Sequence, residues 1–195
     1  MQQPDTAADL VPGDGELRLL PEAIATPELV FERLLAEIDW RQDTARIMGR
    51  AVNLPRLTAW YGDAGYRYSG IDNPPRPWLE LLRELKDMAE TLAGASFNSV
   101  LANLYRHGQD SMGWHSDDER ALGQDPVIAS LSFGAERRFR LKHKRHPEKR
   151  IGLDLPSGSC LVMAGTLQHH WQHALPKTAR PVGPRVNLTF RLIRS

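Results

Sequence analysis

Residues 185–192 read RVNLTFRL, and this stretch decides the fold class. Apolar residues alternate strictly with polar ones, which is typical of a β-strand with two unlike faces. One face carries Val186, Leu188, Phe190 and Leu192, and the other carries Arg185, Asn187, Thr189 and Arg191. The pattern therefore predicts a strand whose apolar face packs on a hydrophobic core.

Short apolar runs between turn residues follow one another from residue 97 to the C-terminus. They cover Val100–Tyr105, Val127–Phe133, Arg138–Leu141, Ser159–Met163 and Val186–Ile193. This spacing predicts a β-sandwich or barrel. Glycines at 49, 62 and 65 mark further hairpins within Arg46–Tyr68.

Two amphipathic helices are predicted ahead of this region. The first begins after Thr26, with Pro27 at its first position and a stripe formed by Phe31, Leu34, Leu35 and Ile38. The second follows a proline-rich break at 74–77 and stops at Gly94. Its apolar face comprises Trp78, Leu81, Leu82, Leu85, Met88, Ala89 and Leu92.

These patterns together predict an α+β fold that is mainly β, with a jelly-roll core and two supporting helices over one sheet. Residues 1–20 are polar and aperiodic, so we expect a flexible N-terminal arm there and a single domain over 21–195.

The composition of the 195 residues excludes several classes of protein. With 41% hydrophobic and 25% charged residues the chain is globular, and no apolar run approaches the roughly 20 residues of a membrane helix. The single cysteine, Cys160, excludes a disulfide framework. No basic segment followed by an apolar stretch opens the chain. We expect an intracellular monomer, cytoplasmic in a bacterium or nuclear in a eukaryote.

The formal net charge of +1 hides an uneven distribution along the chain. Residues 137–150, here called the basic band, hold eight Lys and Arg residues and one acid, a charge of +7. Residues 1–40 carry nine acids against two arginines, a charge of −7. Such a band favours a polyanionic partner. A solvated hairpin with charged faces would explain it equally well.

A candidate metal motif lies in the segment WHSDDE at 114–119. His115 and Asp117 are two residues apart, so on an extended chain they point the same way. The segment HHWQH at 169–173 offers histidines for a third ligand. One carboxylate with two imidazoles is the facial triad of non-haem Fe(II) oxygenases. H-x-D alone is common in surface loops, and the distal histidine makes the motif more specific.

The polar face of residues 185–192 adds an independent observation. Arg185 and Arg191 pointing into a barrel together would be costly without an anion to pair them. A small dicarboxylate suits them, because each guanidinium can hold a carboxylate with two hydrogen bonds. The alternative is that this face is exposed to solvent.

At this point the motifs carry a family resemblance. Asn103-x-Tyr105, His115-x-Asp117, His173 and Arg185-x-Asn187-x-Thr189-x-Arg191 together resemble the AlkB family of Fe(II)/2-oxoglutarate-dependent dioxygenases. Residues 98–133 and 184–191 are similar to the branch that repairs alkylated DNA and RNA. The likeness extends back through Pro55-Arg56 and Tyr61-Gly62-Asp63 to residues 66–70 and covers most of the chain.

The resemblance implies a double-stranded β-helix core at about 97–195 and roles for individual residues. His115, Asp117 and His173 would bind Fe(II), with His173 chosen because it precedes Ala174-Leu175-Pro176. The residues matching the 2-oxoglutarate site are Asn103, Tyr105, Arg185, Asn187 and Arg191. With O2, the family oxidises N-alkyl groups on bases such as 1-methyladenine and 3-methylcytosine, releasing succinate, CO2 and formaldehyde.

The resemblance also implies a pocket for a flipped-out base, formed with the nucleotide-recognition hairpins at about 40–75. Tyr68 would stack on the base, Tyr66 would hydrogen-bond its edge, and Glu119 would help to recognise it. Ile47 and Met48 match an apolar wedge that the duplex-acting relative inserts into the base stack. An ordinary hairpin core is the alternative for these two. Arg50 and Arg56 are candidate phosphate contacts.

The expected partner is alkylated DNA, single- or double-stranded, with RNA as a further substrate. Three other functions stay open. A zinc hydrolase would use the same ligands but leaves the arginine pair unexplained, and His170 stands inside the His169–His173 spacing where a zinc protease needs a glutamate. The same oxidation could act on a protein or small molecule. A non-catalytic nucleic-acid-binding module would need a degenerate site.

Overall fold

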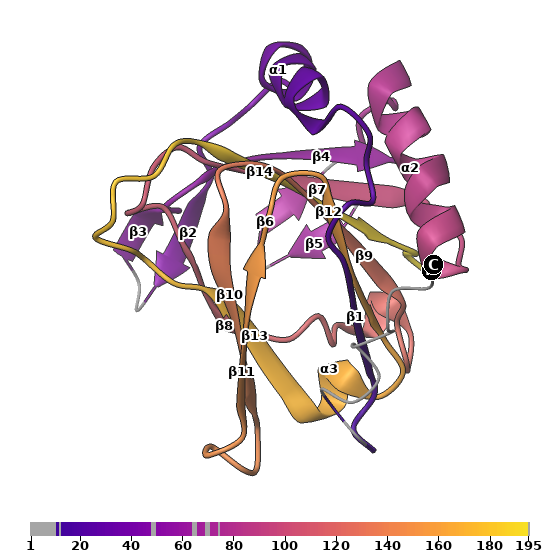
Figure 1. Ribbon diagram of the computed structural model, residues 1–195, viewed down its shortest axis with the longest axis vertical. Coiled ribbons are helices and arrows are strands. Elements are labelled where there is room, and N and C mark those ends of the chain that lie inside the picture. Colours follow the sequence, from indigo (N-terminus) through magenta and orange to yellow (C-terminus); the bar gives the residue numbers. More distant parts are fainter. Residues whose placement is uncertain are drawn as a thin grey trace.

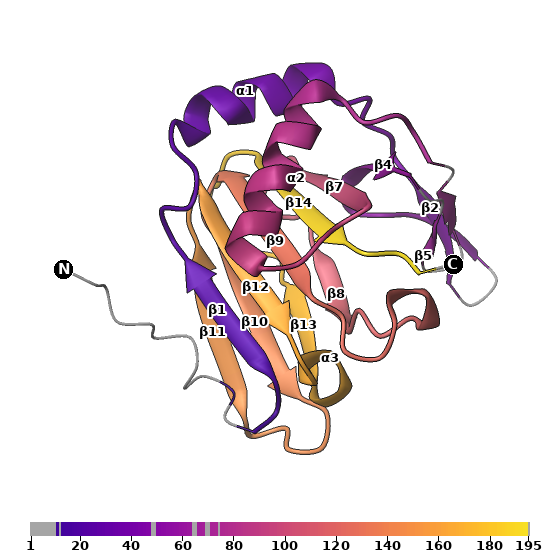
Figure 2. The same cartoon turned by 90° about the vertical axis from the view of Figure 1, so that its right-hand side faces the viewer.

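Two antiparallel β-sheets face each other in the computed structural model, and two helices cover the outer face of the larger sheet (Figure 1 and Figure 2). The structure describes residues 11, 13–47, 50–63, 66–68, 71–73 and 75–194, with the backbone alone described at 45–47, 66–68 and 71–73. This arrangement confirms the predicted mainly-β jelly roll.

The larger sheet has six strands. They are β1 (Glu16–Leu20), β4 (Leu57–Gly62), β7 (Ser99–Tyr105), β9 (Ile128–Gly134), β12 (Ser159–Ala164) and β14 (Arg185–Arg191). Their order across the sheet is β1-β12-β9-β14-β7-β4. The strand that decides the fold class, β14, therefore lies near the middle, hydrogen-bonded to β9 on one side and β7 on the other.

The smaller sheet has four strands, in the order β11-β10-β13-β8. Their bounds are β8 (Met112–His115), β10 (Arg137–His143), β11 (Arg150–Leu155) and β13 (Trp171–Leu175). Two separate hairpins precede the jelly roll in the chain. The first pairs β2 (Thr44–Ile47) with β3 (Arg50–Asn53), and the second pairs β5 (Tyr66–Tyr68) with β6 (Ile71–Asn73).

The helices are α1 (Pro27–Glu37), α2 (Glu80–Ala93) and the short α3 (Leu167–His170), with a 3₁₀ turn at Arg120–Leu122. Pro27 opens α1 as predicted, and Gly94 caps α2 with a left-handed φ of 65°. Two details of the predicted second helix are wrong: Trp78 precedes the helix, and Met88 is 41% exposed. In the described part of the chain, no helix is long and apolar enough to span a membrane.

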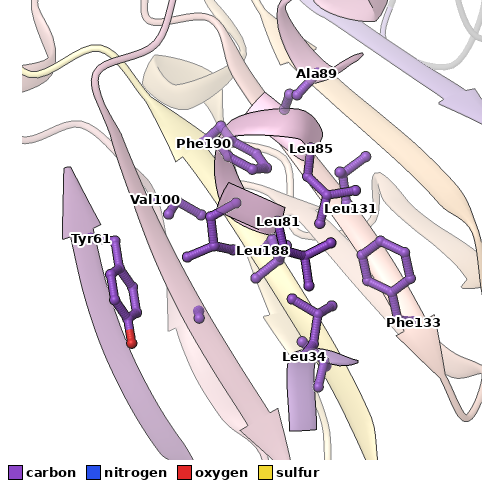
Figure 3. Close-up of a cluster of buried hydrophobic side chains, with 14 of the residues drawn as sticks. Leu34, Tyr61, Leu81, Leu85, Ala89, Val100, Leu131, Phe133, Leu188 and Phe190 are labelled. Atoms are coloured by element: carbon purple, nitrogen blue, oxygen red, sulfur yellow. The ribbon is translucent and has the colours of Figure 1, made fainter. Parts of the chain in front are cut away.

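The main hydrophobic core lies between the larger sheet and the two longer helices. Figure 3 shows Leu81 and Leu85 of α2 close to Leu188 and Phe190 of β14, with Leu34 of α1 beside them. These side chains are almost fully buried. Burial of each stabilises the fold by about 1.5–3 kcal/mol, which fixes the outer face of β14 against the helices.

Every residue of β14 is buried, on both faces. With the apolar side chains facing the helices, Arg185, Asn187, Thr189 and Arg191 face the space between the two sheets, where they line a cavity. The inward polar face is therefore confirmed, and the solvent-exposed alternative is wrong. Leu192 falls after the end of the strand and is 37% exposed.

The predicted flexible arm over 1–20 is wrong at its C-terminal end. Residues 16–20 form β1, an edge strand antiparallel to β12, in which Leu17 pairs with Met163. Leu17 is fully buried in a second core cluster between the sheets. The segment is ordered by a partner strand distant in sequence, which local polarity does not reveal. Of residues 1–15, the structure describes 11 and 13–15.

Three strands of the smaller sheet carry no apolar run that predicted them: β8, β11 and β13. The sequences of β8 and β13 are MGWH and WQHAL, so histidines occupy positions that a core strand would fill with apolar residues. A local departure from the strand pattern is expected where side chains serve a site.

Candidate metal and co-substrate site

Three predicted ligands meet between the sheets. The ligand atoms of His115, Asp117 and His173 all lie within 4.8 Å of one another. His115 Nε2 is 3.9 Å from Asp117 Oδ1, and the two imidazole ring centroids are 4.2 Å apart. His115 ends β8 and faces His173 of β13 across the ladder, so backbone pairing sets their separation.

The ligand atoms of this group suit a cation. His115 Nδ1 lies 2.9 Å from the Gly113 carbonyl oxygen, to which it donates, so the lone pair of Nε2 is directed at the site. Asp117 Oδ2 accepts a hydrogen bond from Arg191 Nη2 at 2.9 Å. Among the described residues, no hydrogen bond reaches buried Asp117 Oδ1. One carboxylate oxygen and two imidazole nitrogens thus converge on one point, and this is a donor set that would suit Fe(II).

The charge states also suit metal binding. Burial alone would raise the pKa of Asp117, but the guanidinium of Arg191, with the imidazoles of His173 and His115 beside it, holds it at about 2. Burial, together with the neighbouring imidazole of His115, lowers the pKa of His173 to about 3. At neutral pH the carboxylate is therefore ionised and His173 is neutral, the forms that ligate metals.

Arg185 is a buried cation beside this group. It is 2% exposed, and its Nη2 donates to Ser132 Oγ at 2.9 Å. Its Nε has no hydrogen-bond partner, and no carboxylate pairs with it in the described part of the chain. Burial lowers its pKa to about 10, so it stays charged at neutral pH. The cavity therefore offers an uncompensated guanidinium to an anion.

The other predicted co-substrate residues line the same cavity. Tyr105 and Asn103 are almost fully buried, and within the described part of the chain the Tyr105 hydroxyl has only a weak contact, 3.8 Å to Met112 Sδ. Asn187 donates both amide hydrogens within the protein, to Ser130 Oγ at 2.8 Å and to the Leu131 carbonyl at 3.1 Å. Asn187 therefore has no spare donor for a ligand, unlike Tyr105.

Arg56 is not the surface phosphate contact that the sequence suggested. It is 5% exposed, and its Nε donates to Asn103 Oδ1 at 2.9 Å. This bond fixes the amide of Asn103 with its oxygen toward Arg56 and its NH2 group turned away from it. Nothing in the Pro55-Arg56 motif distinguishes such a buried contact from a surface one, because the contact joins residues 47 positions apart.

The predicted substrate residues are only partly described. Glu119 is half-buried on the loop after Asp117, and its Oε2 is buried with no hydrogen-bond partner among the described residues. Tyr66 and Tyr68 lie on β5 and Ile47 lies on β2, but their side chains are outside the described part of the structure. Met48 lies wholly outside the described residues. Their roles stay predictions.

The other histidines of the HHWQH segment are turned elsewhere. His169 Nε2 lies 3.0 Å from Asp125 Oδ1 on the surface, and α3 ends at His170, before His173. His169 and His173 therefore do not share a helix, which agrees with the absence of a zinc-protease motif.

Asp14, His143 and His170 form a second group of potential ligands among the described residues. His143 Nδ1 accepts hydrogen bonds from the backbone N–H groups of Arg145 and His146, at 3.1 and 3.0 Å. The proton of the neutral ring is then on Nε2, 3.5 Å from Asp14 Oδ2, where a metal would need a lone pair. These three side chains therefore suit a polar contact between segments of the chain better than a metal site. His143 is itself buried, with 5% of its surface exposed.

The basic band maps to β10, the turn after it and the start of β11. Its charges are not equally available. Arg137 is buried and donates to three backbone carbonyls, and Arg138 pairs with Asp154 at 2.6 Å. Exposed Arg140 has no ion pair among the described residues, and Lys142 Nζ lies 4.5 Å from the ring centroid of half-exposed Trp114.

Sequence reasoning missed the polar residues that support the site. Ser130 and Ser132 on β9 accept from Asn187 and Arg185, and buried Gln168 on α3 accepts from the Asp117 backbone N–H at 2.9 Å. Two serines at alternate positions in an apolar strand were a usable signal for the first pair. For Gln168 the sequence held none.

Comparison with known proteins agrees with this site. A model described as the 2OG-Fe(II) oxygenase superfamily matches residues 17–191. The chain is 46% identical over 173 residues to Alpha-ketoglutarate-dependent dioxygenase alkB homolog 3 of Bos taurus, covering 84% of this chain and 60% of the relative. It is 39% identical over 181 residues to DNA oxidative demethylase ALKBH2 of Homo sapiens, covering 87% and 69%.

The chain thus spans 60% of the length of the alkB homolog 3 relative from Bos taurus. Among solved structures, that of OsALKBH1 matches with a TM-score of 0.65 and 16% identity, covering 90% of this chain and 97% of that one, which shows a shared fold. Given the superfamily match and the identity to the ALKBH2 protein, the chain belongs to the 2OG-Fe(II) oxygenase superfamily and, within it, to the AlkB family.

Proposed function

We propose that the protein is an Fe(II)- and 2-oxoglutarate-dependent dioxygenase that removes alkyl groups from bases of nucleic acid. The printed names of two relatives, an alpha-ketoglutarate-dependent dioxygenase and a DNA oxidative demethylase, support both halves of this proposal. The observation that carries it is that one cavity is lined by the His115–Asp117–His173 group and by the buried guanidinium of Arg185, which has no carboxylate partner among the described residues.

In this proposal His115 Nε2, Asp117 Oδ1 and His173 hold Fe(II). When bound, iron and 2-oxoglutarate supply the oxidation by O2 that hydroxylates the N-alkyl carbon, while 2-oxoglutarate becomes succinate and CO2. The hydroxymethyl group then leaves the base nitrogen as formaldehyde. Asp117 keeps one oxygen for the ion because Arg191 holds the other. The buried site keeps water away from the reacting atoms.

The co-substrate anion is held by the polar face of β14 and its neighbour β7. Arg185 supplies the charge that binds a carboxylate, and the Tyr105 hydroxyl and the amide NH2 of Asn103 supply donors. Asn187 orients the wall through Ser130 and Thr189, each within 3.0 Å of its amide atoms. Arg191 joins the two subsites, since it contacts Asp117 from the same strand face as Arg185.

The substrate class is alkylated DNA, single- or double-stranded, with RNA as a further substrate and bases such as 1-methyladenine and 3-methylcytosine as targets. A base must leave the stack to reach a site between two sheets. Tyr66, Tyr68 and Glu119 are the proposed contacts to the extruded base, and Ile47 and Met48 are proposed to fill the space that it leaves. The basic band supports attraction of phosphates. We propose an intracellular monomer.

The test offers the purified protein Fe(II), 2-oxoglutarate, ascorbate and oligonucleotides carrying 1-methyladenine or 3-methylcytosine, in single- and double-stranded form. Mass spectrometry is expected to show loss of one methyl group, abolished in His115→Ala. His169→Ala is the matched control, since His169 lies on the surface beside Asp125. If succinate forms but neither lesion is repaired, the oxygenase stands and the substrate class is wrong.

A further inference from the structure

Asp117 is held through its backbone as well as through its carboxylate. The Asp117 N–H donates to Gln168 Oε1 at 2.9 Å, a bond between residues 51 positions apart. Both residues are 1% exposed, so no solvent competes for this bond. Among the described residues, the other end of the amide, Gln168 Nε2, contacts only Met163 Sδ, at 3.8 Å. Sulfur is a weak acceptor, so the Asp117 N–H fixes the orientation of the amide.

Gln168 belongs to the segment that also carries the distal histidine. It lies in α3, which continues directly into β13, and His173 follows five positions later. Ser116 Oγ donates to the Trp171 carbonyl at 2.8 Å, so the loop with Asp117 is bound to this segment twice. One stretch of chain, residues 168–173, therefore holds the loop that carries Asp117 and also carries His173.

Lys144 also connects the loop after Asp117 to the segment with Gln168, from the protein surface. Its Nζ donates to the Gln168 carbonyl at 2.8 Å and to Asp118 Oδ2 at 3.0 Å. Its backbone N–H donates to the His170 carbonyl at 2.7 Å. Its ion pair with Asp118 is exposed and contributes little. The buried bond between Gln168 and Asp117 is the stronger restraint, because an unsatisfied buried N–H is costly.

We infer that Gln168 is a positioning residue for the metal site, which holds the carboxylate of Asp117 in register with the imidazole of His173. The inference rests on the proposed assignment of His115, Asp117 and His173 as metal ligands. Groups that orient metal ligands commonly change metal affinity by about 10- to 100-fold when they are removed. A merely structural role for Gln168 would change stability without that selective loss.

The test measures binding of Mn(II) and Co(II) to the full chain by titration, with the Co(II) absorption spectrum as a report of ligand geometry. Gln168→Met keeps side-chain length but removes the acceptor, and is expected to weaken binding by about 10- to 100-fold and alter the Co(II) spectrum. Gln168→Glu keeps an acceptor oxygen and is expected to bind at least as well as the native chain.

Gln172→Met is the matched control. It makes the same chemical change in β13, at the position before His173, where the side chain points away from that histidine. It should leave affinity unchanged. If Gln168→Met does not fold, Gln168→Asn takes its place in the test. Asparagine is one methylene shorter, so its amide oxygen no longer reaches the Asp117 N–H.

Native affinity and spectrum in folded Gln168→Met, with binding lost in His115→Ala, would overturn the positioning role and leave the ligand assignment intact. Native affinity in His115→Ala would overturn the ligand assignment and this inference with it. Faster hydrogen exchange at the Asp117 amide in Gln168→Met is the expected companion result.

Discussion

Among single residues, Arg56 supports the cavity between the sheets although it does not line it. Its buried contact with Asn103 orients an amide in the wall of the co-substrate cavity. We predict that Arg56→Ala weakens 2-oxoglutarate binding roughly tenfold, the equivalent of about 1.5 kcal/mol for the removal of a charge-assisted hydrogen bond. Calorimetric titration in the presence of Mn(II) measures this. Arg41→Ala, at an exposed arginine paired with Asp39, is the control. Equal affinity in both variants would refute the role.

Asp110 gives a prediction for stability against pH. It is 2% exposed and accepts three hydrogen bonds from Arg106. Burial would raise its pKa, but the bonds from Arg106 lower it below the ordinary value. A lowered folded-state pKa stabilises the fold above the unfolded pKa of about 4, and this stabilisation disappears as the pH falls through the folded value.

Asp110→Asn should therefore cost about 2 kcal/mol at pH 7, with the gap to the native chain closing below about pH 4. Urea denaturation across this pH range checks the sign. A gap that widens in acid would contradict the assignment of the ionised carboxylate as the stabilising form.

The candidate ligands could be picked out from the sequence, whereas the side chains that support them could not. H-x-D spacing and strand alternation identify His115, Asp117, Arg185 and Arg191, because each depends on neighbours two residues away. The contacts of Gln168 and Arg56 depend on packing between segments 51 and 47 residues apart. No local pattern encodes such a contact.

Among the elements, the two longer helices and the apolar strands followed from periodicity, and β1 did not. Leu17 of β1 is fully buried between the sheets. We predict that Leu17→Ala lowers the free energy of unfolding by about 2–5 kcal/mol, as for other fully buried leucines. The midpoint of urea denaturation measures it, with half-buried Leu19→Ala expected to cost less. A change below about 0.5 kcal/mol would place the strand outside the core.

The strands that carry the candidate metal ligands were the hardest to predict, for a physical reason. In β8 and β13, histidines replace apolar residues on the inner face, and the resulting strands are short. Their stability comes from β10 and from each other. Because the site needs histidines at these positions, β8 and β13 lack the apolar alternation that would have identified them as strands.

At the scale of the whole molecule, net charge says little and the placement of charge says more. In the basic band, Arg137 is buried and Arg138 is paired, while Arg140 and Lys142 have no carboxylate partner among the described residues. Under the proposed function, Arg140→Ala with Lys142→Ala should weaken binding of every oligonucleotide sequence similarly. The slope of log affinity against log salt should fall by about 1 for each phosphate that the double variant can no longer bind.

Arg138→Ala is the control for this pair, since Asp154 already neutralises that charge. Fluorescence anisotropy between low and physiological salt provides the slopes. An unchanged slope in the double variant would show that Arg140 and Lys142 of the basic band do not contact phosphate groups.

The site forms only when the whole jelly roll is folded. Its side chains come from β7, β8, β13 and β14 and the loop after β8, so the two sheets must face each other for the ligands and the arginines to meet. The family resemblance predicted this assembly because it spans all of these segments at once. Composition and charge alone would have fitted many other folds.

The most direct test of the proposed dioxygenase counts three products in one reaction: methyl groups removed from a 1-methyladenine oligonucleotide, succinate formed and formaldehyde released. With Fe(II), O2 and 2-oxoglutarate present, the proposal predicts equal amounts of all three, and none from His115→Ala. Methyl loss that continues without 2-oxoglutarate, or with Zn(II) in place of Fe(II), would contradict it.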